Sequence, residues 1–420
     1  MVLPVPGGPC TAVSVELQKA SAARRWRAVS AGPAPTRAKV YPVGVVVDAT
    51  RAKATWHLQR ELTAALETAL RFVTEERSLR PLFRHDPEAA ARLCQLFAIW
   101  GSTLLSLGNC LSPDAGSVAR VVIDEAGQCH PAHAVSALMR SGSALIVGDV
   151  HQLTPVIELG TEDDERLIRS KRIALAPEML APYRTHRESV ASVQSLAERA
   201  VPERHALLDH FRCHPAIIAI SDALCAYGLD VHTPRPPDRG RGLLPHAVAS
   251  IDVRGAQEAH FGSWYNELEL RETLALLDRL LASGRAPSGI AVITPYRAQL
   301  ERLRRGVVER GIPLEPSLEL AELDEPPAPS TGGLALGTVH RFQGGERRVV
   351  LFTTVATRAR SLSFLNARPN LLNVAVSRAR DHFVCIGDRR VLELGERTRL
   401  IVDAAAPLTP LVRPRASGPT

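Results

Sequence analysis

Aromatic residues make up only 4% of this 420-residue chain, and no apolar run reaches the length of a membrane span. Residues Met1–Ser21 also lack the basic start and long apolar centre of a signal peptide. The lack of a membrane span and of a signal peptide argues against a membrane protein and a conventionally exported one. We therefore expect a cytoplasmic protein with no membrane partner.

Cysteine is scarce too. The seven cysteines are an odd number, lie far apart and form no CxxC pair, which argues against a disulfide framework or a structural zinc site. The densest group of metal-binding residue types is Cys129, His130 and His133, but no partner ligands accompany it. We interpret these three as ordinary residues at the start of a helix.

The net charge of the chain is the first feature that indicates a kind of partner. The chain carries 51 Lys and Arg against 44 Asp and Glu, a net charge of +7. Such a balance suits a polyanionic partner such as nucleic acid, although an arginine-rich composition alone also produces it.

Short apolar runs that end in a turn or an acidic residue, each followed by a helical pattern, recur along the chain. This alternation predicts an α/β fold of parallel sheets flanked by helices. At this length, two domains with separate cores are expected. The runs are residues 43–48, 121–124, 144–149, 290–295, 349–354 and 383–388.

A lobe boundary is expected near Pro202, because the helical stretch 188–200 before it carries no strand signal. Lobe one would then cover residues 1–200 and lobe two residues 201–403. The Pro-rich composition of residues 233–245 and 314–333 predicts loops or mobile insertions. Residues 404–420 read as a disordered tail.

The strongest local signal is VVIDEAGQ, an apolar strand that delivers Asp124 and Glu125 to its carboxyl end. Open parallel sheets bind ligands at that edge. One carboxylate there can hold Mg²⁺ on a phosphate chain, and the other can orient and deprotonate an attacking water. The alternative is a strand followed by the acidic first turn of a helix.

The same arrangement recurs in LIVGDVHQLTPV, where a strand ends at Asp149 and Gln152 follows. If the two strands are neighbours, their carboxyl ends meet. The amide of Gln152 both donates and accepts hydrogen bonds, which suits contact with a terminal phosphate or the water beside it.

Taken in order, DEAGQ, GDVHQLTPV, FRCHP, ITPY, TVHRFQGGE and NVAVSRAR resemble motifs II to VI of superfamily 1B helicases over residues 101–388. The resemblance is closest to the group of the nonsense-mediated-decay RNA helicase and the Okazaki-fragment nuclease-helicase. It implies two RecA-like lobes of the P-loop NTPase type. It also implies an ATP-dependent motor that uses ATP and Mg²⁺ and moves on single-stranded DNA or RNA.

Each matching motif implies roles for particular residues of this sequence. The resemblance implies Mg²⁺ binding by Asp124, water activation by Glu125, a γ-phosphate contact by Gln152, and arginine fingers at Arg212 and Arg378. Such a finger contributes roughly 10³ to 10⁵ in rate. Phe211 matches an adenine-stacking aromatic and Glu346 a ribose contact, and Asp149, Gln343 and Gly344 complete the nucleotide set.

Nucleic acid in the family is held mainly through its phosphates. The positions of this sequence that match are Thr103, Thr294, Pro295, Tyr296, Thr338 and His340. Because aromatic residues are few, we expect phosphate contacts to dominate and affinity to fall steeply with salt.

One motif is missing. The family begins with a phosphate-binding loop GxxxxGK[ST], and the nearest segment here is GGPCTAVS at residues 7–14, with Val13 in place of the lysine and Ser14 as a possible magnesium ligand. Three hypotheses stay open: an active or formerly active helicase, a nucleic-acid-binding pseudo-helicase, or the carboxyl portion of a longer helicase.

Overall fold

The computed structural model describes residues 11–16, 60, 63, 67, 99–111, 118–157, 159–186, 189–234, 243–315, 332–339, 345–367 and 369–412. The chain divides into two compact units. The amino-terminal unit comprises residues 12–148 and 155–204, and the carboxy-terminal unit comprises 1–11, 149–154 and 205–420. Within the described ranges, no helix is long and apolar enough to cross a membrane.

Strands β2 and β3 of the amino-terminal unit belong to a four-stranded sheet with the order β2-β3-β1-β6. Its members are β1 (Thr11–Glu16), β2 (Val118–Ile123), β3 (Ser141–Gly148) and β6 (Arg204–Ala206). Helices α6 (Pro131–Arg140) and α9 (Val193–Ala200) share a core with β2 and β3 that includes Ile123 and Ile146. The remaining described elements are α5 (Leu107–Cys110), α7 (Thr161–Ser170), α8 (Pro177–Leu180), η1 (Ala181–Tyr183), β4 (Thr185–His186) and β5 (Ser189–Val190).

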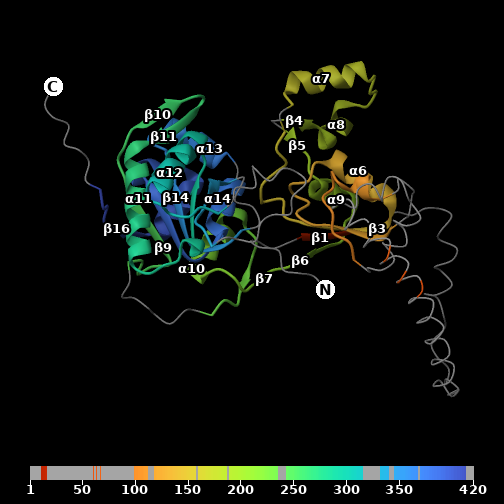
Figure 1. Ribbon diagram of the computed structural model, residues 1–420. Helices are drawn as coiled ribbons and strands as arrows, with labels where there is room; N and C mark the ends of the chain where they lie inside the picture. The colour runs from red at the N-terminus through yellow and green to blue at the C-terminus, as the bar shows by residue number, and fades with distance from the viewer. Residues whose placement is uncertain are drawn as a thin grey trace, which may run out of the picture. The chain divides into compact units, whose positions relative to one another are not determined.

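The carboxy-terminal unit is built on a six-stranded sheet in the order β13-β12-β14-β15-β9-β16 (Figure 1). Every neighbouring pair in it is parallel. The strands are β9 (Val248–Asp252), β12 (Ile290–Thr294), β13 (Ala335–Thr338), β14 (Arg347–Thr353), β15 (Ala379–Gly387) and β16 (Ala406–Leu408).

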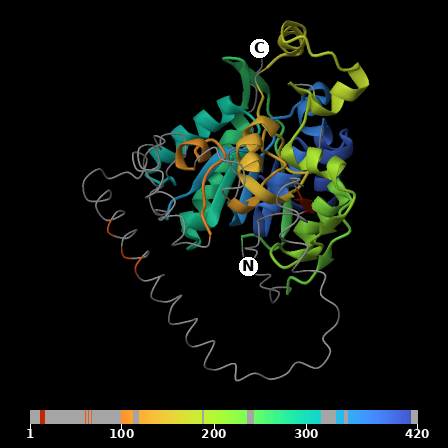
Figure 2. The same cartoon turned by 90° about the vertical axis from the view of Figure 1, so that its right-hand side faces the viewer.

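Helices cover both faces of this sheet (Figure 2), so its central strands are apolar on both sides. On β12, Ala291 and Ile293 pack in one core with helices α10 (Pro215–Cys225), α14 (Pro369–Ser377) and α16 (Glu396–Ala404). Ile290 and Val292 pack in the other core with α11 (Glu267–Ala282) and α12 (Arg297–Glu309). Smaller elements are β7 (Asp209–His210), β8 (Asp230–Val231), β10 (Gln257–His260), β11 (Ser263–Asn266), η2 (Pro287–Gly289), η4 (Ala359–Ser361), α13 (Leu362–Asn366) and α15 (Arg389–Leu392).

Two helices begin with the same His-Pro pair. In α6, His130 Nδ1 accepts a hydrogen bond from Ala132 N at 3.1 Å, and in α10, His214 Nδ1 accepts one from Ala216 N at 3.1 Å. The following proline has no N–H to satisfy at a helix start. His130 is therefore a helix cap, which confirms its interpretation as a helix-start residue.

The α/β fold is confirmed, and five of the six apolar runs fall on strands β2, β3, β12, β14 and β15. The sixth, residues 43–48, lies outside the described residues, as do most of the two expected insertions. Strands β9 and β13 and the hairpin β10–β11 were not anticipated.

The prediction of a disordered tail from residue 404 is wrong for its first part. Residues Ala406–Leu408 form β16, an edge strand paired with β9. Beyond it, Leu411 N and Val412 N each donate to the buried carboxylate of Glu272, at 2.7 and 2.8 Å. Burial of Leu408 against the core and these hydrogen bonds offset the entropy of ordering this segment.

The segment proposed as a degraded phosphate loop is also not as expected. Residues Thr11–Glu16 form strand β1, so Ser14 lies inside a strand instead of a loop that enters a helix. Residues 7–10 lie outside the described part of the chain. A role for Ser14 in phosphate binding stays a prediction without local support from the fold.

Candidate nucleotide and nucleic-acid sites

The turn after β2 carries the first two catalytic candidates. Asp124 is exposed, and its Oδ1 accepts a hydrogen bond from Glu125 N at 2.9 Å. Glu125 has φ of 53°, a left-handed conformation that costs energy in any residue with a Cβ, and its Oε2 accepts from Gln128 Nε2 at 2.9 Å. Backbone strain of this kind concentrates at functional sites, where it fixes the direction of a side chain.

Gly148, at the end of β3, makes that turn possible. Ala126 N donates to Val147 O at 2.9 Å, which draws the turn onto the end of β3. A Cβ on Gly148 would lie 2.8 Å from both Ala126 N and Gly127 N. Only glycine allows this approach of two backbones, so Gly148 helps to set the orientation of Glu125.

The segment after β3 is held by a buried polar cluster of the carboxy-terminal unit. Asp149 accepts from Tyr227 Oη at 2.6 Å and from His151 N at 2.8 Å, and burial raises the pKa of its carboxyl. Asn373 Nδ2 donates to Tyr227 Oη at 2.8 Å and to His151 O at 3.1 Å. Because both oxygens of Asp149 already accept hydrogen bonds, its contact with a nucleotide stays a prediction.

Gln152 belongs to the same segment. Its side chain is buried, and the Oε1 atom has no hydrogen-bond partner among the described residues. Asn370 Nδ2 donates to the carbonyl oxygen of Gln152 and, at 3.1 Å, to that of Val150. The backbone at Gln152 is thus fixed while one amide oxygen remains available to a donor such as water.

Arg212 lies at the amino edge of the six-stranded sheet, where β14 and β15 begin. Its Nη2 donates to Ser377 O at 2.6 Å, and its Nε forms an ion pair with Glu346 at 3.3 Å. Arg378 follows Ser377, is fully buried, and accepts through its carbonyl oxygen from Arg347 N at 2.9 Å. The sequence-predicted residues Arg212, Glu346 and Arg378 are therefore brought together at this edge.

The sequence did not predict two further side chains near Arg212. Cys213 is fully buried with its Sγ donating to Ser377 O at 3.4 Å, and burial raises the pKa of its thiol. His210 Nε2 accepts from Cys213 N at 2.8 Å. Burial and the charge of Arg212 lower the pKa of His210 to about 4, so the imidazole is neutral at pH 7 and accepts this hydrogen bond.

Next to Arg212, the ring of Phe211 is 69% exposed and stacks on His232 with 5.0 Å between ring centroids. A hollow of about 540 Å³ opens at the same amino edge of the sheet. Among the residues that line it are Arg285, Glu346, Arg347, Arg348 and Arg380. This concentration of guanidinium groups favours an anionic ligand.

The nucleic-acid candidates Thr294, Pro295 and Tyr296 lie at the opposite, carboxyl edge. Thr294 ends β12 and is fully buried, and its hydroxyl accepts from Tyr296 N at 3.5 Å. Thr338 ends the neighbouring strand β13. Tyr296 is the N-cap residue of α12. It is half-buried, and its ring centroid lies 5.8 Å from that of Phe364.

Beneath this edge, Glu269 of α11 organises the turn after β14. Its carboxylate accepts from Val355 N at 2.8 Å, Thr353 Oγ1 at 2.7 Å and Asn266 Nδ2 at 3.0 Å. Complete burial raises the pKa of Glu269 to about 8. Val355 has φ of 61°, which a β-branched residue rarely adopts, so the bond to Glu269 helps to hold a strained turn.

The structure does not place every predicted residue. Gln343, Gly344 and His340 lie outside the described residues. Thr103 is exposed in the amino-terminal unit, where its hydroxyl hydrogen-bonds Ser106 Oγ at 2.9 Å. Tyr227 and Glu269 were missed, since no local motif marks a buried polar residue whose partner is far away in the sequence. Asn373 was missed although it is the first residue of the NVAVSRAR motif.

Comparison with known proteins supports the motif assignment. Residues 191–390 match a family model described as an AAA domain. A protein named "Putative helicase MOV-10" from Gallus gallus is 28% identical over 345 residues, which cover 72% of this chain and 33% of that protein. The "5'-3' DNA helicase ZGRF1" of Mus musculus is 28% identical over 222 residues, 50% of this chain and 11% of that protein. The human "RNA helicase Mov10l1" is 25% identical over 319 residues, 66% of this chain and 23% of that protein.

The chain is thus related to helicases of superfamily 1B, and the family expected from its motifs is confirmed. It spans a third or less of the length of these three relatives. Their names include a DNA helicase and an RNA helicase, so similarity alone does not select one kind of strand.

Proposed function

We propose that this chain is an ATP-dependent helicase or translocase that couples ATP hydrolysis to movement on single-stranded DNA or RNA. The observation that carries the proposal is the arginine cluster at the amino edge of the six-stranded sheet. There, Arg212 is fixed through Glu346 and through Ser377 O, one residue before the buried Arg378. Preorganised guanidinium groups of this kind stabilise the charge that develops on a transferring phosphoryl group.

Residues outside the arginine cluster supply the carboxylates and the amide that ATP hydrolysis also needs. Asp124 has an exposed carboxylate at the carboxyl end of β2, which fits a ligand of Mg²⁺. Glu125, with its side-chain direction set by a left-handed backbone, would deprotonate the attacking water. Bound Mg²⁺ would neutralise charge on the terminal phosphates, and Gln152 would orient the water through its amide.

Strand-stimulated ATP hydrolysis by the purified chain tests this function, with single-stranded DNA and RNA compared as stimulants. Glu125→Gln removes the base but keeps the size of the side chain, and we expect it to abolish hydrolysis without loss of strand binding. Glu162→Gln makes the same chemical change at an exposed position of α7 and serves as the matched control. Hydrolysis that persists in Glu125→Gln would overturn the assigned mechanism.

The strand at Thr11–Glu16, in place of a phosphate loop, favours a second candidate, a nucleic-acid-binding pseudo-helicase. Loss of a lysine beside a triphosphate removes preorganised charge from the transition state. Strand binding by a wild-type chain that does not hydrolyse ATP would support this alternative. A cytoplasmic location stays a prediction.

A further inference from the structure

The hairpin β10–β11 follows directly from the carboxyl end of β9. Strand β9 is parallel to β15, which is parallel to β14, and β14 is parallel to β12. The hairpin therefore emerges from the same edge of the sheet as the Thr294–Tyr296 turn, the edge at which open α/β sheets bind ligands. In both ribbon views it projects from the end of the unit (Figures 1 and 2).

The turn at the tip of this hairpin contains a residue type that its backbone conformation disfavours. His260 pairs with Ser263, which leaves a two-residue loop of Phe261 and Gly262 with φ of 43° and 71°. Positive φ at both positions defines a type I′ turn, in which asparagine or glycine is favoured at the first position. A phenylalanine there strains the backbone.

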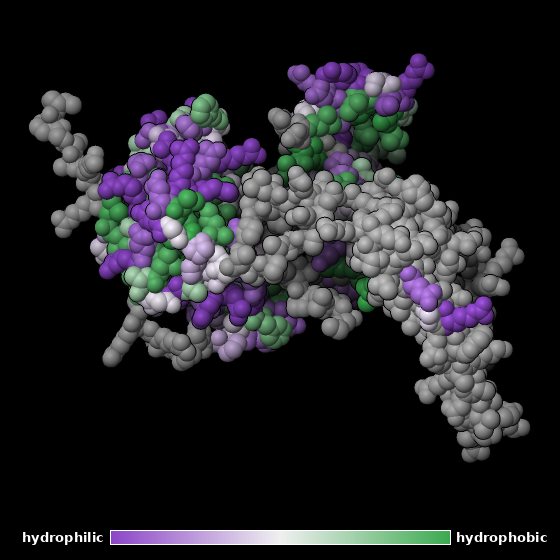
Figure 3. Space-filling model, viewed as in Figure 1, coloured by the Kyte–Doolittle hydropathy of each residue, from purple (hydrophilic) through white to green (hydrophobic). Residues whose placement is uncertain are grey.

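The exposure of the Phe261 side chain to solvent is also unfavourable. Its side chain is 96% exposed, the largest value for a large hydrophobic side chain in the described part of the protein. In Figure 3, hydrophobic colour appears over the hairpin within a largely hydrophilic surface. The ring of Phe261 meets that of His260 edge-on, with 4.6 Å between centroids, and is otherwise open to solvent. A residue that violates local preferences in this way points to a functional role, in which another molecule covers it.

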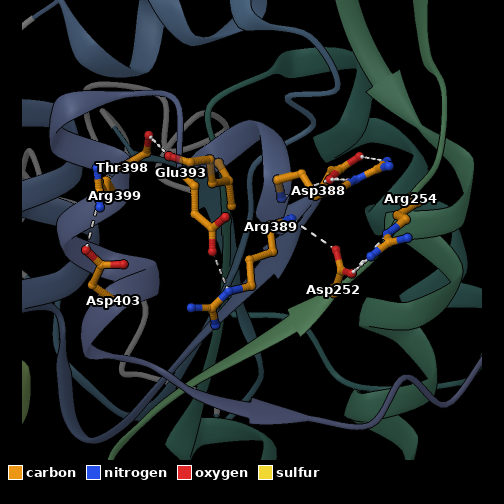
Figure 4. A network of polar contacts seen from close by, with 10 residues as sticks. Asp252, Arg254, Asp388, Arg389, Glu393, Thr398, Arg399 and Asp403 are labelled. Atoms are coloured by element: carbon orange, nitrogen blue, oxygen red, sulfur yellow. Dashed lines mark hydrogen bonds and ion pairs between the residues drawn. The ribbon is translucent and has the colours of Figure 1, made fainter.

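The hairpin beneath the tip is firmly held. Arg302 of α12 lies over the Tyr265 ring, 3.6 Å from its centroid, and Ser263 Oγ accepts from Ala298 N at 3.2 Å. At the root, Arg254 pairs with Asp252, whose other oxygen accepts from Arg389 N at 3.0 Å (Figure 4). The tip is thus presented from a fixed base, which lowers the entropy cost of binding.

The surroundings indicate what binds there. Arg297, next to the Ala298 contact, is exposed, as are Arg358 and Arg360 on the segment that follows β14. That segment meets the hairpin through a hydrogen bond from Ser361 Oγ to Gln257 Oε1. An exposed aromatic ring on a hairpin whose neighbouring segments carry guanidinium groups suits single-stranded nucleic acid, which binds by base stacking and phosphate pairing.

We propose that Phe261 is a base-stacking residue: the hairpin β10–β11 forms part of the nucleic-acid site and places this ring against an unpaired base. The inference rests on the proposed function and extends its strand-binding site beyond the residues of the helicase motifs. Exposed arginines flank the hairpin, so the occupant is a single strand with an anionic backbone, DNA or RNA.

The test separates stability from binding. Phe261→Asn relieves the strained turn, so we expect the melting temperature to rise by about 2 °C. Removal of the ring should weaken binding of a single-stranded oligonucleotide about tenfold. Phe261→Trp keeps a stacking surface and should retain wild-type affinity. Val308→Ser, which removes a 61%-exposed apolar side chain near the far end of α12, should change neither strand affinity nor salt dependence.

The outcomes are distinct. Wild-type protein that binds no oligonucleotide would overturn the proposed function itself. Wild-type binding that Phe261→Asn leaves unchanged would overturn only the stacking role. If Phe261→Asn instead abolishes self-association in sedimentation while strand affinity is unchanged, the occupant is a second copy of this chain and the proposal is wrong.

Discussion

The amino and carboxyl edges of the six-stranded sheet are built in different ways. At the amino edge, Arg212, Glu346 and Arg378 are buried or half-buried and connected by ion pairs and hydrogen bonds. At the carboxyl edge, Phe261 and Phe364 are exposed aromatic rings above a buried carboxylate network. One edge presents charge in a fixed geometry, whereas the other presents stacking surfaces on turns.

This difference matches two kinds of ligand. A phosphoryl group in transfer requires charges at fixed positions, because reorganisation during reaction raises the barrier. A strand that must slide through a site is better held by contacts that every nucleotide offers, which stacking and phosphate pairing provide. If the two edges serve these separate purposes, changes at one should leave the other's ligand unaffected.

The largest expected effect is at the amino edge. Arg378→Lys keeps the charge but loses the planar guanidinium, and we expect strand-stimulated kcat to fall by roughly 10³-fold or more. Circular dichroism and thermal melting establish that the variant is folded. Strand affinity should be unchanged, and an equal loss of strand affinity would show that the two edges are not separate.

Glu269 should give the carboxyl edge a distinctive pH dependence. Its pKa rises from 4.5 in the unfolded chain to about 8 in the folded one. Between these values the folded state holds a proton that the unfolded state releases, so the free energy of unfolding should decrease as pH rises, by at most about 1.4 kcal/mol per pH unit. Denaturant titrations from pH 5 to 9 measure this slope, and Glu269→Gln should flatten it. A slope identical in wild type and variant would show that Glu269 does not titrate in this range.

His210 should give the amino edge the opposite and smaller dependence. Its pKa is about 4 in the folded chain against 6.5 in the unfolded one. The unfolded state therefore takes up a proton first, and the free energy of unfolding should decrease as pH falls from 6.5 to 4. His210→Gln, which keeps an acceptor for Cys213 N, should remove this decrease in the same titrations. If the free energy of unfolding of the variant falls between pH 6.5 and 4 as much as that of wild type, the assignment of a neutral, buried His210 is wrong.

The smallest expected effect concerns the exposed arginines of the carboxyl edge. Replacing Arg358 and Arg360 together by Gln should lower the slope of log affinity against log salt by about 0.7 for each phosphate that the variant no longer pairs with. Fluorescence anisotropy at several salt concentrations measures it. Arg212→Lys is the comparison at the other edge, and its salt slope should equal that of wild type.

Local sequence was sufficient for much of this protein. Alternating apolar runs and helical patterns predicted the strands β2, β3, β12, β14 and β15, because buried parallel strands need apolar residues on both faces. Motif order placed Arg212, Glu346 and Arg378 in one site, and the structure brings them together. The strand at Ala406–Leu408 was missed, because a short edge strand is stabilised by its partner β9 and not by its own sequence.

Pairings across long stretches of chain were decided only by tertiary structure. Asp149 hydrogen-bonds Tyr227, 78 positions away, and Glu269 hydrogen-bonds Val355 N, 86 positions away. No nearby sequence pattern marks either pair. The left-handed backbones of Glu125 and Phe261 likewise follow from the turns that packed strands impose. Sequence determined which residue types stand at strand ends, because short-range hydrogen bonds and periodicity encode them. Packing decided which of those groups are buried, paired or left exposed to a ligand, because burial depends on the whole folded chain.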